Sequence, residues 1–379
     1  MGSLSVLNIG VDARNLIVRP TGIGRYIIES CKSLIDLGHT LHLYLPSTPV
    51  SYEILPDGAH LHVSHWPGSV ARIIWGGTEV GRLARRDNVD VFWGPAHRLP
   101  LRGFAPMPTV LTIHDLVWLV ASDTMRARNY YAEKALMLPA LRNATRIVSV
   151  SEATRKDIVT YFPEVAYKVN HIYPGWVSNL VGVGAIPVKN TLSMPRYGLF
   201  VGTLEPRKNL LNLLEAYALL PEKLRRQNGL VIAGGQGWRM PNLRREIARL
   251  GLTDCVQLRG YVTDEELGEL YRHARFLAMP SRFEGFGLPI IEANSFGVPV
   301  ITSNRSSMPE VVGEAGLLVD PDNVDSIKQA LLNIMIDDAL HSYLCDKARK
   351  NISRFDWQKC AEGLTEVFER AISQYKGGH

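Results

Sequence analysis

The sequence predicts an α/β protein made of two doubly wound, Rossmann-like domains that face a cleft. Its 379 residues exceed the size at which a single hydrophobic core usually stops growing. Short β-branched runs alternate with helical patterns in two separate series, which indicates βαβ units and mostly parallel sheets. Clefts between domains concentrate small-molecule sites, so the loops at such a cleft are the first candidates for function.

The first series defines an N-terminal domain over residues 1–176. Its first strand is followed by a helical pattern over 24–38. The predicted strands lie at 6–11, 40–46, 89–95, 108–115, 146–151 and 168–175. In an open parallel sheet, ligands bind beyond the carboxyl ends of the strands, in the loops that lead into helices. We therefore examine the residues that directly follow each strand.

A linker is predicted over 177–196, where glycines and prolines break any steady period. The second series fills a C-terminal domain over 197–355. Its predicted strands lie at 197–202, 229–235, 255–260, 275–281 and 299–304. One helix of this domain begins with a capping box, Thr263 and Glu266. The final segment, 356–379, has a helical pattern with no strand after it, and we expect it to pack back on a domain, with the N-terminal domain as the candidate.

Composition excludes several classes of protein. The cysteines are scattered, without a CxxC pair or histidines at zinc spacing, which argues against a disulfide framework and a structural metal. A net charge of +5 without a basic and aromatic stripe does not indicate a nucleic-acid partner. The sequence contains neither a secretory signal pattern nor an apolar run of about 18 residues. A cytoplasmic location is expected.

One basic segment, residues 69–86, has two interpretations. It carries four arginines against a single acidic residue, Glu79, with several apolar neighbours. The arginines are Arg72, Arg82, Arg85 and Arg86. A basic helix with an apolar face can lie on an anionic membrane, which would make the protein peripheral at the inner face of the cell membrane. The alternative is an ordinary helix packed on its domain with a solvated basic side, and two glycines weaken the helix.

The stretch RFEGFGLPIIE, residues 282–292, places two glutamates around a glycine-rich turn. It follows a predicted strand, and Gly285 and Gly287 would let a ligand approach the backbone. The next helix begins there, so its N-terminus would favour a phosphate, and Glu292 would lie in its first turn. Because a diphosphate repels carboxylates, Glu284 and Glu292 are expected to accept hydrogen bonds from hydroxyls on either side of it. Two sugars joined through a diphosphate present hydroxyls in this way.

A second candidate loop is VGTLEPRKN, residues 201–209, which also leads from a strand into an amphipathic helix. Arg207 and Lys208 bring two positive charges to a helix N-terminus, where the helix dipole disfavours them unless an anion binds. We therefore predict a phosphate site. The alternative is a structural salt bridge, because Glu205 is close in sequence.

In the N-terminal half, Gly22 and Gly24 open a helix, and His114 and Asp115 follow a strand. A glycine pair at a turn is a weak signal. A lone histidine at a strand end is more often a structural residue than a catalyst. The His-Asp pair could suggest a metal ligand, but no other histidine or aspartate cluster at ligand spacing supports one. No metal is therefore predicted.

At these residues the sequence resembles glycosyltransferase family 4, the retaining enzymes of the GT-B fold. The central motif is E-x7-E, here Glu284 to Glu292 in EGFGLPIIE. GIGRY, TIHD, VGTLEPRKN and the stretch 308–323 also match, in order, so the resemblance spans almost the whole chain. As a constellation the signal is specific, whereas each piece alone would be weak.

The resemblance implies roles for the C-terminal residues. Glu284 would contact the donor hexose and Glu292 the ribose of the nucleotide, while Lys208 would bind the diphosphate. Many members have arginine where this chain has Thr203, so Arg207 would take part of that role. Further contacts with the donor are expected from Gly202, Gly285, Phe286, Gly287 and Leu288.

Further roles concern the base and the other domain. Tyr261 and Val262, after a strand end, are candidates for the base pocket. By resemblance, Gly22 and Gly24 would close on the donor, and His114 would lie near the transferred sugar. Variable loops such as 95–108 would contact the acceptor.

By resemblance, the activity is transfer of a hexose from a nucleotide sugar to a saccharide or lipid-linked acceptor. The GTLEPRKN and GVDAR versions of the motifs are most similar to mannosyltransferases of bacterial polysaccharide and O-antigen assembly, which use GDP-mannose. Cationic side chains and helix N-termini that face the departing diphosphate would stabilise the negative charge that builds on it. No metal or other cofactor is therefore expected. We further predict that Glu284→Ala abolishes transfer with little effect on folding.

Three alternatives remain at this point. A nucleotide-sugar epimerase of similar architecture would need its own acid and base but no acceptor site. A nicotinamide-dependent dehydrogenase is disfavoured because no strand leads into GxGxxG with an acidic residue about 20 positions later. A non-catalytic subunit that binds nucleotide sugars is the third alternative, and the presence of Glu284, Arg207 and Lys208 argues against it.

Overall fold

The structure, a computed structural model, describes residues 5–19, 22–101, 103, 107–122, 125, 127–176 and 196–377. The chain divides into two compact units. The first comprises Met1–Val120, Ala127–Gly175 and Asp356–His379, and the second Ala121–Arg126 and Trp176–Phe355. The predicted linker 177–196 lies outside the described residues except for Arg196.

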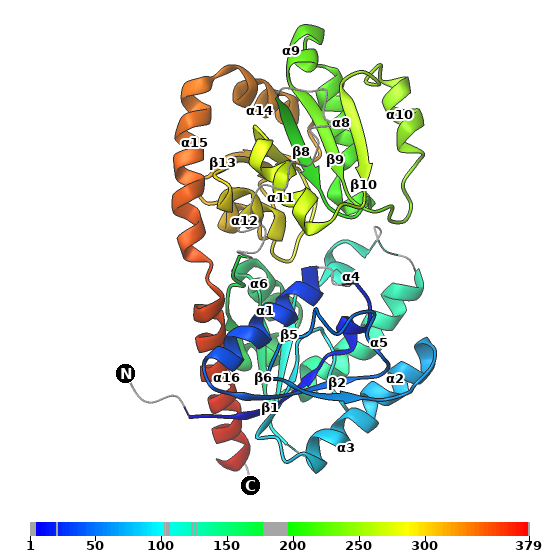
Figure 1. Cartoon of the computed structure of the whole chain (residues 1–379), viewed down its shortest axis with the longest axis vertical. Coiled ribbons are helices and arrows are strands. Elements are labelled where there is room, and N and C mark those ends of the chain that lie inside the picture. The colour runs from blue at the N-terminus through cyan, green and yellow to red at the C-terminus, as the bar shows by residue number, and fades with distance from the viewer. Residues whose placement is uncertain are drawn as a thin grey trace. The chain divides into compact units, whose positions relative to one another are not determined.

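The first unit is built on a seven-stranded parallel sheet in the order β3-β2-β1-β4-β5-β6-β7 (Figure 1). The strands are β1 (Asn8–Asp12), β2 (Thr40–Leu45), β3 (His60–Val63), β4 (Val91–Gly94), β5 (Thr109–Ile113), β6 (Arg146–Ser149) and β7 (Val169–His171). The central strands β4 and β5 are buried at every position, as expected for a parallel sheet with helices on both faces.

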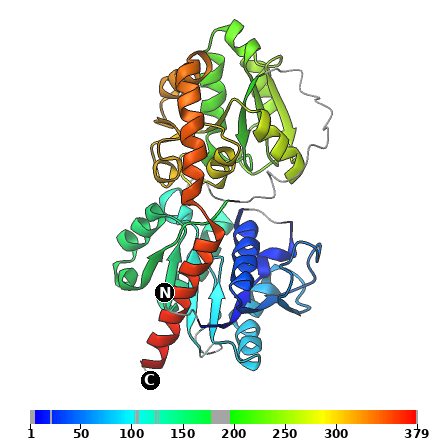
Figure 2. The same cartoon turned by 60° about the vertical axis from the view of Figure 1, so that its left-hand side comes forward.

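Most helices of the first unit connect consecutive strands, whereas α16 comes from the C-terminal part of the chain. They are α1 (Gly22–Asp36), α2 (Ser69–Gly77), α3 (Glu79–Arg86), α4 (Val117–Val120), α5 (Ala127–Asn143), α6 (Glu152–Tyr161) and α16 (Trp357–Gly377), with short 3-10 turns η1 (Arg14–Ile17) and η4 (Pro163–Lys168). The C-terminal α16 packs beside α1 and over β4, β5 and β6, and Figure 2 shows it in red along this unit. The chain's last helix thus completes the covering of the first sheet.

The second unit repeats this architecture with a six-stranded parallel sheet in the order β10-β9-β8-β11-β12-β13. The strands are β8 (Tyr197–Val201), β9 (Gly229–Ala233), β10 (Val256–Gly260), β11 (Phe276–Met279), β12 (Val300–Ser303) and β13 (Gly316–Val319). The helices are α8 (Leu210–Ala218), α9 (Glu222–Gln227), α10 (Leu243–Arg249), α11 (Asp264–His273), α12 (Leu288–Ser295), α13 (Met308–Val312), α14 (Val324–Ile336) and α15 (Asp338–Asn351), with η5 (Pro206–Lys208) and η6 (Ile352–Arg354).

Both sheets are doubly wound, which confirms the predicted fold class. In each, the order of strands reverses beside the first strand, between β1 and β4 and between β8 and β11. Loops that leave neighbouring strands at such a switch point part in opposite directions and open a binding crevice. The loops after β8 and β11 therefore hold the strongest candidates in the second unit. No helix in the described part of the chain has both the length and the apolar character to cross a membrane.

Candidate functional site

The two C-terminal loops predicted to bind the donor meet at the switch point of the second sheet. Arg207 and Lys208 lie in η5, directly after β8, and Glu284 follows the neighbouring strand β11. Arg207 Nη1 donates to Glu284 Oε2 at 2.6 Å, and Lys208 Nζ donates to Glu284 Oε1 at 2.6 Å. Ser281 Oγ donates to the same Oε1 at 2.8 Å. Two cations and one carboxylate from separate loops thus form one group.

The ion-pair alternative for VGTLEPRKN is also realised, because Arg207 Nε contacts Glu205 Oε1 at 2.5 Å. Glu205, Lys208 and Glu284 are buried, with at most 7% of each residue exposed. Two positive and two negative side chains therefore balance one another beneath the loop. Phosphate binding by Arg207 and Lys208 stays a prediction, and a phosphate would meet cations that are already held in place.

The charges of this group are set by burial and by its ion pairs. Burial alone would raise the pKa of Glu284, but Arg207 and Lys208 outweigh it and lower that pKa to about 2. Burial lowers the pKa of Lys208, and Glu284 opposes this shift. The pKa of Glu205 is raised because burial outweighs the attraction of Arg207 and Lys208. Glu284 is consequently a carboxylate at neutral pH and a poor proton donor.

The glycine-rich turn after Glu284 is held from the loop that follows β12. Ser306 Oγ donates to the Glu284 carbonyl oxygen at 2.5 Å, and Ser307 Oγ lies 3.0 Å from that oxygen and 2.8 Å from the Phe286 carbonyl oxygen. Gly287 is the N-cap of α12, with φ of 100°, a conformation that glycine adopts without strain. The stretch from Gly285 to Leu288 thus leads directly into α12, as predicted.

The prediction that Glu292 lies in the first turn of the helix is wrong. Helix α12 begins at Leu288, so Glu292 is its fifth residue and no acidic residue lies in the first turn. Its side chain is buried and accepts a 2.8 Å hydrogen bond from Tyr271 Oη of α11. The spacing of two glutamates predicted neither Tyr271 of α11 nor Ser306 and Ser307 after β12, because these residues come from other segments of the chain.

The remaining predicted residues of the second unit lie in loops after β8 and β10. Gly202 has φ of 145°, and a Cβ on Gly234 would come within 1.9 Å of the Gly202 carbonyl oxygen. The two loop backbones therefore approach closely, which requires glycine at position 234. Thr203 is exposed, Tyr261 is 62% exposed, and Val262 is half-buried.

In the first unit, His114 directly follows β5, and its ring and main chain are both held in place. His114 Nε2 lies 2.7 Å from the Pro95 carbonyl oxygen, which can only accept, so Nε2 carries the proton. Burial and the neighbouring His97 lower the pKa of His114 to about 3, against the weaker effect of that hydrogen bond. The ring is neutral at pH 7, with Nδ1 as an acceptor. Gly22 opens α1, and Gly24 is buried in its first turn.

His97, after β4, was not identified from the sequence. Its Nε2 accepts from the His114 main-chain N–H at 2.9 Å, and its Nδ1 lies 3.7 Å from Glu133 Oε2. Its φ of 61° is unusual for a residue with a side chain. Burial would raise the pKa of Glu133, but His97 and Arg98 together lower it to about 2. The position of His97 after a strand at the switch point was the signal that could have revealed it.

A cavity of about 70 Å³ lies within the first unit, partly beside the predicted acceptor loop 95–108, of which residues 102 and 104–106 are outside the described part. Apolar side chains and two guanidinium groups line it. The lining residues are Arg14, Ile73, Gly76, Gly77, Arg98, Leu99, Pro100, Leu101, Ala135, Leu136, Pro139 and Asn143. Arg14 is held by Asp12, with Nε 2.9 Å from Oδ1, and Arg98 by Glu133 at 2.7 Å. The cavity therefore has a mixed apolar and polar wall.

Comparisons with known proteins agree with this arrangement. The model described as Glycosyl transferases group 1 matches residues 185–351, and Glycosyltransferase Family 4 matches residues 20–176. O-antigen chain mannosyltransferase B of Escherichia coli is 36% identical over 293 residues, 76% of this chain and 76% of that protein.

Two solved structures share the fold at low sequence identity. WaaG, a glycosyltransferase involved in lipopolysaccharide biosynthesis, matches with a TM-score of 0.76 and 17% identity, over 96% of this chain and 99% of that chain. Anabaena HepE in complex with UDP-glucose matches with a TM-score of 0.75 and 20% identity, over 96% of this chain and 100% of that chain. These structures show the same fold, and the two family models with the 36% identity to the Escherichia coli enzyme identify the chain as a glycosyltransferase that belongs to family 4.

Proposed function

We propose that this protein transfers mannose from GDP-mannose to a saccharide or lipid-linked saccharide acceptor in the synthesis of a surface polysaccharide, with retention at the anomeric carbon. The support for mannose is the name of the Escherichia coli relative, an O-antigen chain mannosyltransferase at 36% identity. The likeness to HepE, at 20% identity, bears on the fold alone, so its UDP-glucose is no argument about the donor.

The observation that carries the proposal is the buried group of Glu284, Arg207 and Lys208 at the switch point of the second sheet. When a nucleoside diphosphate leaves, negative charge builds on its phosphate oxygens. Fixed cations stabilise that charge without having to reorganise, which is usually the largest contribution to catalysis. Glu284 holds both cations and would also accept hydrogen bonds from donor hydroxyls. Glu292, fixed by Tyr271, would do the same for the ribose.

For the chemical step we propose attack from the face that the diphosphate leaves. The acceptor oxygen bonds to the anomeric carbon, the bond from that carbon to the phosphate oxygen breaks, and the acceptor proton passes to the leaving phosphate oxygen. The glycosidase route needs a carboxylate nucleophile about 5 Å from an acid. Glu284 is unsuited to it, because cations hold both of its oxygens. A role for His114 near the sugar, and a reaction that needs no metal or cofactor, stay predictions.

Thermal stabilisation by a panel of nucleotides and nucleotide sugars, with and without EDTA, tests the donor. Stabilisation by GDP and GDP-mannose that EDTA does not change is the expected result. A preference for UDP compounds would show that GDP-mannose is not the donor, and absence of any response would contradict binding of a nucleotide-sugar donor. Release of free nucleoside diphosphate only in the presence of an acceptor would separate transfer from epimerisation.

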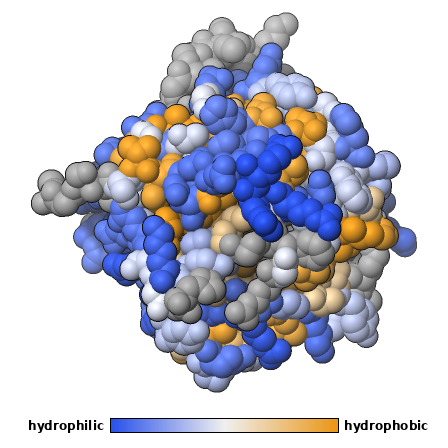
Figure 3. All heavy atoms as spheres, turned by 90° about the horizontal axis from the view of Figure 1, so that it is seen from below, coloured by the Kyte–Doolittle hydropathy of each residue, from blue (hydrophilic) through white to orange (hydrophobic). Residues whose placement is uncertain are grey.

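For the acceptor we propose that the cavity beside loop 95–108 receives part of a lipid-linked saccharide, and that the surface near α2 contacts an anionic membrane. Helix α2 buries Trp75 but exposes Val70 by 69%, Ile73 by 44% and Ile74 by 51%. The end of the first unit seen in Figure 3 carries strongly hydrophilic and hydrophobic side chains in close mixture. Apolar side chains next to basic ones are typical of a surface that binds the membrane interface.

A further inference from the structure

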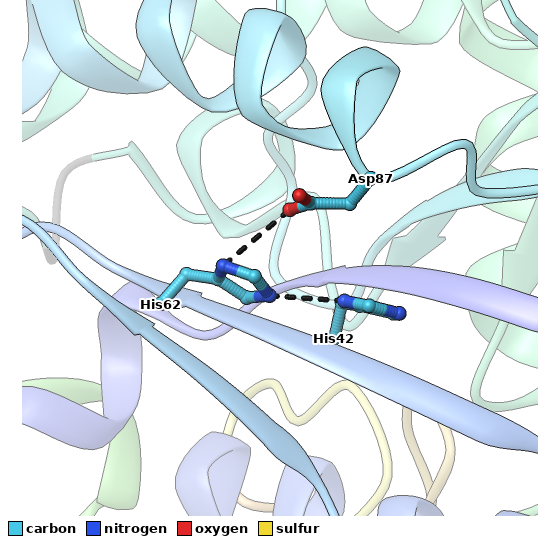
Figure 4. Close-up of side chains that lie close together, drawn as sticks. All are labelled: His42, His62 and Asp87. Atoms are coloured by element: carbon cyan, nitrogen blue, oxygen red, sulfur yellow. Dashed lines mark hydrogen bonds and ion pairs between the residues drawn. The ribbon is translucent and has the colours of Figure 1, made fainter.

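Three side chains of the first unit that the sequence does not bring together form a compact polar cluster (Figure 4). His42 lies on β2, His62 on the edge strand β3, and Asp87 directly after α3. His42 Nδ1 is 2.9 Å from His62 Nε2, and His62 Nδ1 is 3.4 Å from Asp87 Oδ2. Each residue can offer one ligand atom such that the three atoms lie within 4.8 Å of one another.

The register of the two strands explains how the histidines meet. His42 pairs with His60, and Tyr44 pairs with His62. Because side chains alternate between the faces of a strand, all four rings lie on one face of the sheet. His60 also stacks on His42, with ring centroids 4.9 Å apart. A parallel register thus gathers three imidazoles at the sheet edge.

Asp87 is fixed with one oxygen turned toward these rings. Arg86 Nε donates to Oδ1 at 3.1 Å, whereas Oδ2 accepts from Tyr44 Oη at 3.0 Å and faces His62. The pKa of Asp87 is lowered, because Arg86, Tyr44 and His62 outweigh the effect of its partial burial. A carboxylate and two imidazoles are therefore in place before any ligand arrives.

We propose that His42, His62 and Asp87 bind one divalent transition-metal ion, with Zn²⁺ as the reference ion. Two imidazole nitrogens and one carboxylate oxygen suit Zn²⁺, Cu²⁺, Ni²⁺ or Co²⁺, whereas Mg²⁺ and Ca²⁺ require mostly oxygen ligands. Bond lengths of 2.0–2.1 Å place the ligand atoms of tetrahedral zinc roughly 3.3 Å apart. His62 faces His42 with Nε2 and Asp87 with Nδ1, and only one of these nitrogens can bind the ion. With one atom from each residue, the three ligand atoms lie within 4.8 Å of one another, so side-chain rotations have to close them around the ion. Water or His60 would complete the coordination.

The ion would take a structural role, separate from glycosyl transfer. It would join the edge strand β3, strand β2 and the end of α3, which already meet here through hydrogen bonds and ring contacts. In the first sheet, two strands, β1 and β4, separate β2 from β5, the strand that His114 follows. The inference therefore does not depend on the proposed donor or acceptor.

Calorimetric titration of the full-length, tag-free and EDTA-stripped protein with Zn²⁺ tests the proposal, with Mg²⁺ as the ion that should give no binding. One Zn²⁺ per chain in the micromolar range is expected. His42→Gln and His62→Gln should each weaken binding at least tenfold. His65→Gln is the matched control, because His65 is exposed and close in sequence but outside the cluster, and it should bind as the unaltered protein does.

Absence of Zn²⁺ binding would overturn the proposal, as would binding that His42→Gln and His62→Gln leave unchanged. Circular dichroism of each variant separates loss of a ligand from loss of the fold. If both histidine variants unfold, the visible spectrum of Co²⁺ added to the Asp87→Asn variant tests the site instead. Loss of the tetrahedral Co²⁺ bands in folded Asp87→Asn supports the site, and unchanged bands contradict it.

Discussion

Lys208 Nζ and Glu284 Oε1 lie 2.6 Å apart inside the second unit, although 76 positions separate the two residues in the chain. Each has less than a tenth of its surface exposed. A buried ion pair contributes little net stability when intact, but removal of one partner leaves the other charged and without compensation. The group proposed to bind the donor is therefore also a part of the folded core.

The first prediction concerns Glu284→Ala. The sequence alone predicts loss of transfer with little effect on folding, and the structure revises the second half of that expectation. Without Glu284, Arg207 and Lys208 lose a shared partner beneath the loop. We expect the free energy of unfolding to fall by about 3–5 kcal/mol, together with loss of activity. Urea denaturation followed by circular dichroism measures the first effect, and a transfer assay the second.

Glu222→Ala is the matched control for this measurement. Glu222 also forms an ion pair, with Arg226 at 2.6 Å, but both side chains are about two-thirds exposed. Exposed pairs contribute little, so a change within about 0.5 kcal/mol is expected. If both substitutions lower the free energy of unfolding equally, removal of Glu284 does not leave buried cations without compensation.

The second prediction concerns Tyr271, whose hydroxyl donates to Glu292 at 2.8 Å. Tyr271→Phe removes that hydrogen bond and frees the carboxylate to rotate away from the ribose that we propose it binds. KM for the donor should rise by about tenfold with kcat almost unchanged, because the ribose is remote from the reacting bond. Steady-state kinetics over a range of donor concentrations gives both values.

Tyr217→Phe distinguishes a specific effect from a general loss of packing. Tyr217 is equally buried in the same unit and donates to the Asn228 carbonyl oxygen at 2.6 Å, at the end of α9. This variant should lose stability and keep its KM. If KM for the donor rises equally in both variants, the rise does not depend on the hydrogen bond from Tyr271 to Glu292.

Much of the fold could be predicted because its strands carry a strong local signal. β5 and β9 are buried throughout and mostly apolar, and Thr263 and Glu266 form the predicted capping box. The prediction did not include β3 and β13, one edge strand of each sheet, although it did include the opposite edge strands, β7 and β10. An edge strand is less buried, so its sequence is more polar and harder to recognise, as HLHV in β3 shows.

The site was predictable only where strand-end loops carry a motif. Arg207, Lys208 and Glu284 could be found because each follows a strand, but their mutual pairing depends on the order of β8 and β11 in the sheet. Tyr271 and Ser307 come from other elements and reach the site through tertiary packing. Spacing along the chain therefore identifies the residues of one loop but not the residues that support it.

The third prediction concerns the basic segment. The structure divides it into α2 and α3, and Arg72 is half-buried, with Nη2 3.4 Å from Ser47 Oγ. We therefore restrict the substitution to the exposed Arg82, Arg85 and Arg86, each changed to Gln. Binding to phosphatidylglycerol vesicles should weaken by at least tenfold, since each basic residue near an anionic surface is worth about 1 kcal/mol. Sedimentation with vesicles measures it.

A matched set of exposed arginines on the second unit provides the control. Arg226, Arg244 and Arg245 are also exposed and can be changed to Gln together. The control should retain vesicle binding because these residues lie outside the proposed surface. If the two triple variants bind alike, only net charge matters, and residues 69–86 are an ordinary pair of helices on their domain.

The last prediction follows from the lowered pKa of His114, which is about 3 in the folded protein, whereas the ordinary pKa of histidine is 6.5. Between these two pH values the unfolded chain binds a proton that the folded protein rejects, so the free energy of unfolding falls as the pH is lowered. From pH 7 to pH 5 this single residue should cost about 2 kcal/mol. His114→Gln keeps a donor for the Pro95 carbonyl oxygen but cannot titrate. Urea denaturation at both pH values should therefore show a smaller acid loss in His114→Gln than in the unaltered protein, whereas His65→Gln, at an exposed site, should lose as much as the unaltered protein. An equal loss in all three proteins would mean that His114 takes up its proton in the folded state, and that its ring is not held neutral by the contacts with Pro95 and His97.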